Sequence, residues 1–195
     1  MKSFSRRLGV GARLYALVGL FGIGCMVLAS VLIWLQNERA VEARKHSLEQ
    51  LVDAAIGVLD AHHKLAQQGV MSEDEARKRA LLVVANMRYG HGDYFAARGL
   101  DGITIMNAAA PQTVGKNRDD VTDSKGRHYV RQMTEVVRDH GQGYVDYVFP
   151  KPGSKVEAEK TTFLKLYKPW GIALLTGVYM DDLQADLNQA MIQAG

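Results

Sequence analysis

The chain has 195 residues, 47% of them hydrophobic, and a formal net charge of +3. This length allows one globular domain with additional segments. The small net charge argues against nucleic acid as a partner, because nucleic-acid-binding domains are strongly basic. A single cysteine, Cys25, excludes an internal disulfide. Any folded part must therefore rest on an ordinary hydrophobic core, which the length permits.

An uncharged run of 22 residues, residues 14–35, lies near the N-terminus. As a helix it is about 33 Å long, enough to cross a hydrocarbon core of about 30 Å. Basic residues precede the run and a mixed group follows it: Lys2, Arg6, Arg7 and Arg13 before, and Asn37, Glu38 and Arg39 after. The positive excess predicts a cytoplasmic N-terminus, with everything after Trp34 outside the cytoplasm.

A cleaved signal peptide is the first alternative for this run. Signal peptides have a shorter apolar core and a small-residue cleavage site, whereas this run continues to Leu35, past the plausible sites. The segment "GIGC" is similar to a lipoprotein box, but Gly22 stands where that motif has an aliphatic residue. We therefore favour an uncleaved membrane span that contains Cys25.

Two helices are predicted after the span. Residues 37–68 contain no proline, and their apolar residues recur at spacings of three and four, which is typical of one long amphipathic helix. Gly69 follows as a helix terminator. The second helix begins at Ser72, with Glu75 completing a capping box, and runs to about Arg88.

A change of period then marks the beginning of a sheet. The segments "GDYFAAR" and "GITIMN" are separated by "GLDG", whose Asp-Gly pair is typical of a hairpin turn. After a loop, "RHYVRQMTEVVRDH" is helical and Gly141 ends it. Three more strands follow, "GYVDYVF", "TTFLKLYK" and "IALLTGVY", and short turns between them predict antiparallel neighbours. The last predicted helix covers residues 180–193.

This order of elements predicts an α+β fold. An N-terminal transmembrane helix precedes a long helix, which packs on one face of a five-stranded antiparallel sheet.

Five segments, in this order, resemble one known family: "MRYGHGDYF", "LDG", "GKN", "GQGYVDYVFPKPG" and "KPWGIALLTGVYMDD". Together they resemble the single Cache domain, the extracytoplasmic PAS-like sensor of bacterial methyl-accepting chemotaxis receptors and sensor kinases. The resemblance covers residues 37–183. It implies a sheet that binds a small ligand, most often a short carboxylate, in a homodimeric receptor of the bacterial inner (plasma) membrane. It also implies a second membrane span and a cytoplasmic signalling module.

On this basis we expect four parts: a cytoplasmic N-terminus (1–13), a transmembrane helix (14–35), a periplasmic single Cache sensor domain (36–183) and a helix leading towards a second span (184–195). The sequence ends where that span is expected, so we expect a truncated receptor or a fragment. The family often has histidine and proline at the end of the second strand, where this chain has Asn107 and Ala108. The resemblance therefore does not specify the acid.

A carboxylate ligand requires cationic and hydroxyl donors in an otherwise apolar pocket. Arg88 and Tyr89 precede the sheet directly, and an arginine there could bind both carboxylate oxygens. Asn107 ends a strand face that also carries Ile103 and Ile105. The other candidate ligand-binding residues are Tyr94, Lys116, Tyr147 and Lys165, and the resemblance favours Arg88, Tyr94 and Tyr147 over the rest.

These three favoured residues also have structural interpretations. Tyr94 and Tyr147 could be half-buried core aromatics with their hydroxyls at the surface. Arg88 could pair with an acidic residue such as Glu75 or Asp93.

For the lysines, the undecided question is which of them reach the pocket. Lys116 could be a solvated turn residue. Lys165 and Lys160 lie on one predicted strand but face opposite sides of it, so only one of them can reach the pocket. The sequence does not decide between them.

Catalytic and metal-binding patterns are absent from the sequence. The adjacent His62 and His63 point about 100° apart on a helix, and no calcium-loop pattern surrounds Asp123. No "GxSxG" elbow or phosphate-binding loop is present. We therefore expect a sensor without enzymatic activity or cofactor, which binds a small organic acid. The alternative is a ligandless interaction or dimerisation module that contacts a periplasmic binding protein, which a collapsed or apolar cavity lacking Arg88 and Tyr94 would favour.

Overall fold

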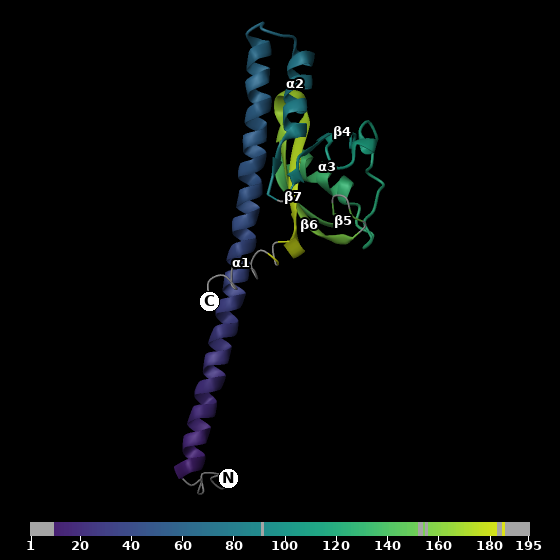
Figure 1. Ribbon diagram of the computed structural model, residues 1–195. Coiled ribbons are helices and arrows are strands. Elements are labelled where there is room, and N and C mark those ends of the chain that lie inside the picture. Colours follow the sequence, from purple (N-terminus) through teal and green to yellow (C-terminus); the bar gives the residue numbers. More distant parts are fainter. Residues whose placement is uncertain (1–9, 91, 152–153, 155, 183–184, 186–195) are drawn as a thin grey trace. The chain divides into compact units, whose positions relative to one another are not determined.

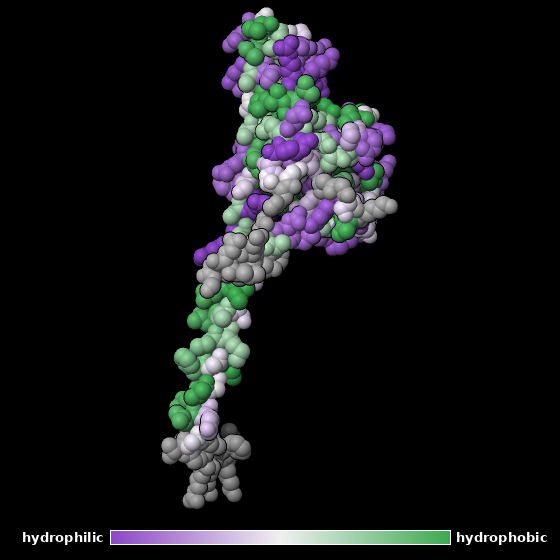
Figure 2. Space-filling model, in the orientation of Figure 1, coloured by the Kyte–Doolittle hydropathy of each residue, from purple (hydrophilic) through white to green (hydrophobic). Residues whose placement is uncertain are grey.

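The computed structural model describes residues 10–90, 92–151, 154, 156–182 and 185, and it divides into two units, Met1–Ala43 and Arg44–Gly195. Helix α1 (Val10–Gln67) contributes to both. Among the described residues, one helix is long and apolar enough to cross a membrane, and it contains the predicted span. Its apolar side chains between Leu14 and Trp34 are exposed, and Figure 2 shows them along this part of the helix. The basic residues Lys2, Arg6 and Arg7 lie outside the described residues.

The second unit contains a five-stranded sheet with helices on both faces (Figure 1). The strand order is β4-β3-β7-β6-β5, and all neighbours are antiparallel, which confirms the predicted sheet. The strands are β3 (Ala96–Gly99), β4 (Thr104–Asn107), β5 (Gln142–Pro150), β6 (Glu157–Tyr167) and β7 (Ile172–Tyr179). A separate small hairpin, β1 (Arg88–Tyr89) with β2 (Asp93–Tyr94), was not predicted.

One face of the sheet carries α1 and α2 (Glu73–Asn86). The buried residues of α1 follow a spacing of three and four and pack against the sheet: Leu48, Val52, Ala55 and Leu59. Gly69, with φ +75°, follows α1 as predicted. Ser72 caps α2 by accepting a hydrogen bond from the Glu75 backbone nitrogen at 3.2 Å, whereas the Glu75 carboxylate accepts from Arg79 Nε at 2.6 Å. The capping box is therefore only half formed.

The other face carries α3 (Tyr129–His140) and residues 108–128, here named the covering segment. Val130, Met133 and Val137 face the sheet, and α3 ends at Gly141 as predicted. The covering segment includes a short 3₁₀ helix, Pro111–Thr113, and packs Val121 against this second cluster. The sheet is thus enclosed on both sides.

Strand β7 comes last in the chain but occupies the centre of the sheet. Seven of its eight residues are buried, as expected for a strand covered on both faces.

The predicted hairpin turn joins β3 and β4, and Gly102 in this turn has φ +77°. A Cβ atom at Gly102 would lie 2.4 Å from the Asp119 carboxylate. The predicted helix over residues 180–193 lies mostly outside the described residues.

Candidate ligand-binding site

A cavity of about 50 Å³ lies between the sheet and α3. One water-sized probe needs about 10–15 Å³, so the cavity holds a group of a few non-hydrogen atoms. Strands β3 to β7, the hairpin strand β2, helix α3 and the covering segment all contribute to its wall. Its most informative polar residues are Tyr94, Arg98, Asn107, Tyr147, Lys160 and Thr162.

Lys160 places a buried ammonium group in this wall, with only 4% of the residue exposed. Its Nζ donates to Tyr94 Oη at 3.2 Å and lies 4.6 Å and 4.7 Å from the ring centroids of Tyr94 and Tyr179. Burial lowers the pKa of Lys160 to about 8, although the charge of Asp93 acts in the opposite direction. Among the described residues, no carboxylate lies within ion-pair distance of this Nζ. Aromatic rings and one hydroxyl surround the cation.

Hydroxyl groups gather beside this lysine. Tyr147 Oη lies 3.1 Å from Thr162 Oγ1, and the Tyr147 ring stacks on Tyr129 with centroids 4.4 Å apart. Burial raises the pKa values of Tyr94 and Tyr147 above the usual tyrosine value, so both hydroxyls keep their protons at neutral pH. They can therefore donate to an anion in the cavity.

A second buried cation, Arg98, lines the same cavity and is 5% exposed. Its Nη2 donates to the Gly102 carbonyl at 3.2 Å and its Nη1 contacts Met133 Sδ at 3.5 Å. Its Nε has no hydrogen-bond partner among the described residues. Burial lowers the pKa of Arg98, and the charge of Asp119 partly offsets this effect. The cavity thus carries an excess of positive charge.

The comparison with protein families decides what kind of domain holds this cavity. The model of the family "single Cache domain 2" matches residues 41–193, which is most of the chain. The chain belongs to the single Cache domain family. The Cache domain here is of the chemoreceptor type, and such domains bind ligands without transforming them.

Two curated relatives of the Cache chain are signalling proteins. It is 30% identical over 190 residues to the methyl-accepting chemotaxis protein McpP of Pseudomonas putida, covering 97% of this chain and 35% of the relative. It is also 30% identical over 115 residues to the sensor histidine kinase MctS of Rhizobium johnstonii, covering 58% of this chain and 25% of the relative. The chain therefore spans about a third and a quarter of the length of these relatives.

Two solved structures share the fold of this Cache domain. A periplasmic sensor domain of a chemotaxis protein is 34% identical, with a TM-score of 0.69, covering 72% of this chain and 97% of that one. A Cache chemosensory domain, described for its recognition of carboxylic acids, is 31% identical with a TM-score of 0.70, covering 73% of this chain and 97% of that one. These similarities confirm the α+β fold and the resemblance seen in the sequence.

Three of the seven predicted site residues line the Cache cavity: Tyr94, Asn107 and Tyr147. Asn107 also holds the chain at the end of β4, because its Oδ1 accepts from the backbone nitrogens of Ala109 and Ala110 at 3.1 Å and 3.0 Å. Its amide nitrogen is the polar atom left for a ligand. Two tyrosines and one asparagine of the predicted set thus line the same cavity, and their role in ligand binding stays a prediction.

The other four predicted residues, Arg88, Tyr89, Lys116 and Lys165, are not among the described residues that line the cavity. Arg88 is exposed and its Nη1 donates to the carbonyl of Ala85 at 2.7 Å. The Tyr89 hydroxyl contacts Thr176 Oγ1. Thr176 lines the cavity, so Tyr89 contacts a wall residue and not the cavity itself. Lys116 is exposed.

Lys165 takes part in the opposite layer. Its Nζ forms an ion pair with Asp53 Oδ1 of α1 at 2.7 Å. Lys160, at the other strand parity, enters the cavity, since residues five apart on a strand face opposite sides. The choice that the sequence left open therefore falls on Lys160.

Sequence reasoning missed Arg98 and Arg118 as wall residues. Alternation offered a signal for the first of them, because Tyr94 and Arg98 are four residues apart along one extended segment. Arg118 lies in the irregular covering segment, where no periodicity predicts a direction.

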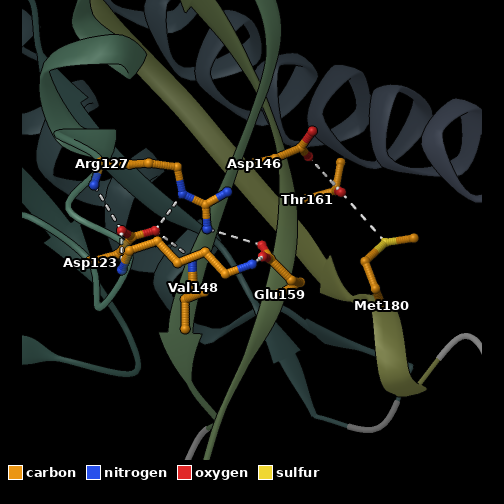
Figure 3. A network of polar contacts seen from close by, with 8 residues as sticks. Asp123, Arg127, Asp146, Val148, Glu159, Thr161 and Met180 are labelled. Carbon is orange, nitrogen blue, oxygen red and sulfur yellow. Dashed lines mark hydrogen bonds and ion pairs between the residues drawn. The ribbon is translucent and has the colours of Figure 1, made fainter.

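The covering segment is attached to the edge of the sheet by Asp123 (Figure 3). The Asp123 carboxylate accepts from the backbone nitrogens of Lys125 (3.0 Å), Arg127 (2.9 Å) and Val148 (2.9 Å), and from Arg127 Nε (2.6 Å). Arg127 Nη2 also donates to Glu159 at 3.0 Å, which Lys125 contacts as well. Burial alone would raise the pKa of Asp123, but these hydrogen bonds outweigh it and lower the pKa to about 2.

Asp123→Asn should lower the free energy of unfolding by about 1–3 kcal/mol, because hydrogen bonds to a charged acceptor are lost. Urea titration of the chain in detergent micelles, followed by tryptophan fluorescence, measures this. The folded pKa lies below the unfolded value, so the stabilisation is full above about pH 4 and declines as the pH falls towards 2. Asp120→Asn is the matched control, since Asp120 is 95% exposed and should change stability little. Equal effects of the two variants would contradict the role of Asp123.

Proposed function

We propose that this cavity binds the carboxylate of a small organic acid, with Lys160 as its counter-cation. The observation that carries the proposal is a buried ammonium group that has no carboxylate partner among the described residues. A ligand carboxylate would accept a charge-assisted hydrogen bond there, which is about twice as strong as a neutral one. It would also offset the cost of burying the cation.

The remaining polar groups suit the same ligand. The hydroxyls of Tyr94 and Tyr147 and the amide nitrogen of Asn107 are donors in the same wall, and Arg98 adds positive charge. The volume of about 50 Å³ limits the ligand to a few non-hydrogen atoms, as in a short-chain acid. The relationship to a Cache domain described for carboxylic acid recognition supports this choice.

We further propose that the Cache domain is the sensor part of a homodimeric transmembrane receptor for chemotaxis or a related signalling pathway. In this arrangement residues 1–13 lie in the cytoplasm, residues 14–35 cross the inner membrane once, residues 36–183 lie in the periplasm, and residues 184–195 lead back towards the membrane. The apolar part of α1 and the names of the two curated relatives support it. Ligand would act by binding unequally to two receptor states.

Calorimetric titration of the full chain in detergent micelles tests the ligand class. Acetate, propionate, lactate, pyruvate and several dicarboxylates are the probes, and we expect saturable binding of at least one short acid. Acetamide and propionamide are the matched controls, because they have similar shape without the charge. If folded protein gives no heat with any acid, the proposal is wrong and the ligandless interaction module is favoured. Equal binding of acid and amide would also contradict it, since Lys160 would then not select an anion.

A further inference from the structure

The ligand cavity has a larger neighbour on its solvent side. An outer pocket of about 310 Å³ lies between the covering segment and the end of β5. Three residues line both the inner cavity and the outer pocket: Arg118, Tyr129 and Phe149. These three side chains therefore stand between the small inner cavity and the larger outer pocket.

Phe149 is the apolar one of these three side chains, and it is half-buried. Its ring centroid lies 5.8 Å from that of Tyr147 and 6.2 Å from that of Tyr129, and the Lys160 Nζ lies 5.7 Å from it. The ring thus stands directly beside the cation proposed to bind the carboxylate. Phe149 is also the second-last residue of β5, which is an edge strand of the sheet.

The other walls of the cavity are held more firmly and leave no room for a longer ligand. Tyr129 is 6% exposed, stacks flat on Tyr147, and belongs to the hydrophobic cluster between α3 and the sheet. The strand walls are fixed by ladder hydrogen bonds, and a close-packed core resists added volume. Extra ligand carbons can therefore be accommodated most readily towards the outer pocket, where the Phe149 ring blocks the way.

We propose that Phe149 is the chain-length filter of the ligand cavity, restricting it to short acids by closing it towards the outer pocket. This inference rests on the proposed function, because it assumes a carboxylate anchored at Lys160. Replacing the ring with a methyl group would join the two spaces. Acids with longer alkyl chains would then keep their carboxylate at Lys160 and extend into the outer pocket.

The test is a calorimetric series of straight-chain acids, from acetate to hexanoate, with the full chain in detergent micelles. Wild type should bind acetate or propionate and bind hexanoate at least tenfold more weakly. Phe149→Ala should bind hexanoate at least tenfold more tightly than wild type, since each newly buried methylene contributes about fourfold. Phe149→Leu, which keeps apolar bulk, should retain the wild-type cut-off. Near-UV circular dichroism establishes that each variant is folded.

The outcomes separate the two proposals. If wild type binds short acids but folded Phe149→Ala shows the same cut-off, the filter is wrong and the proposed function stands. A folded Phe149→Ala that binds no acid of any length also overturns the filter, because the ring would then be needed to hold Lys160 in place. If neither protein binds any acid, the proposed function itself is wrong and the filter with it.

Discussion

Lys160→Met should weaken the binding of the short acid by about thirtyfold or more. Removing one partner of a buried, hydrogen-bonded charge pair costs about 2–5 kcal/mol, which corresponds to roughly thirty- to several-thousand-fold in affinity. Methionine retains most of the apolar stem, so the packing against the Tyr94 and Tyr179 rings is largely preserved. Calorimetric titration of wild type and variant with the same acid measures the loss.

Lys165→Met is the matched control, because Lys165 lies on the same strand but faces the other layer. Its side chain is 34% exposed and pairs with Asp53 across the α1 face. Removing this partly exposed pair should cost at most about 1 kcal/mol of stability and leave the affinity for the acid unchanged. Wild-type affinity in Lys160→Met, or lost affinity in Lys165→Met with an intact fold, would contradict the assignment of the counter-cation.

The main elements were predictable because local patterns define them. The buried side of α1 shows a three- and four-residue spacing, at Leu48, Val52, Ala55 and Leu59. Glycines at positions 69 and 141 follow α1 and α3 as expected. The order of the strands was not predictable in the same way. Strand β7 is central because it pairs with β3 along one edge and with β6 along the other, and this pairing is tertiary.

The site was predictable only where strand alternation applies. Tyr94 and Tyr147 lie on extended segments, so their directions follow from parity, and both line the cavity. The position of Arg88, in contrast, could not be predicted from strand alternation, and Arg88 is not among the described residues that line the cavity. The unpredicted hairpin of β1 and β2 turns the chain directly after α2, and the Arg88 guanidinium donates to carbonyls of Ala85 and Met87 instead.

Ligand binding should depend on pH, because burial lowers the pKa of Lys160 to about 8 in the free protein. An anion binds the protonated lysine, so the affinity for acetate should be constant below about pH 8. Above that pH it should fall by up to about tenfold per unit, until the pH reaches the higher pKa of the bound state. Calorimetry between pH 6 and 10 measures this. The tyrosines around the ammonium keep their protons over this range, because burial raises the pKa values of Tyr94, Tyr147 and Tyr179.

The stability of the unliganded protein should follow the opposite trend. The pKa of Lys160 is lower in the folded state than its ordinary value of 10.5, so the unfolded chain binds more protons between about pH 8 and 10.5. The destabilisation by the buried charge is therefore full below pH 8 and declines as the pH rises through this window. Lys160→Met should be more stable than wild type at pH 7, by about 3 kcal/mol, and this difference should shrink towards pH 10.5. Urea titrations of both proteins at several pH values measure the difference. A difference that does not change with pH would mean that Lys160 already has an anionic partner in the free protein, and the proposed carboxylate site would then lack its driving force.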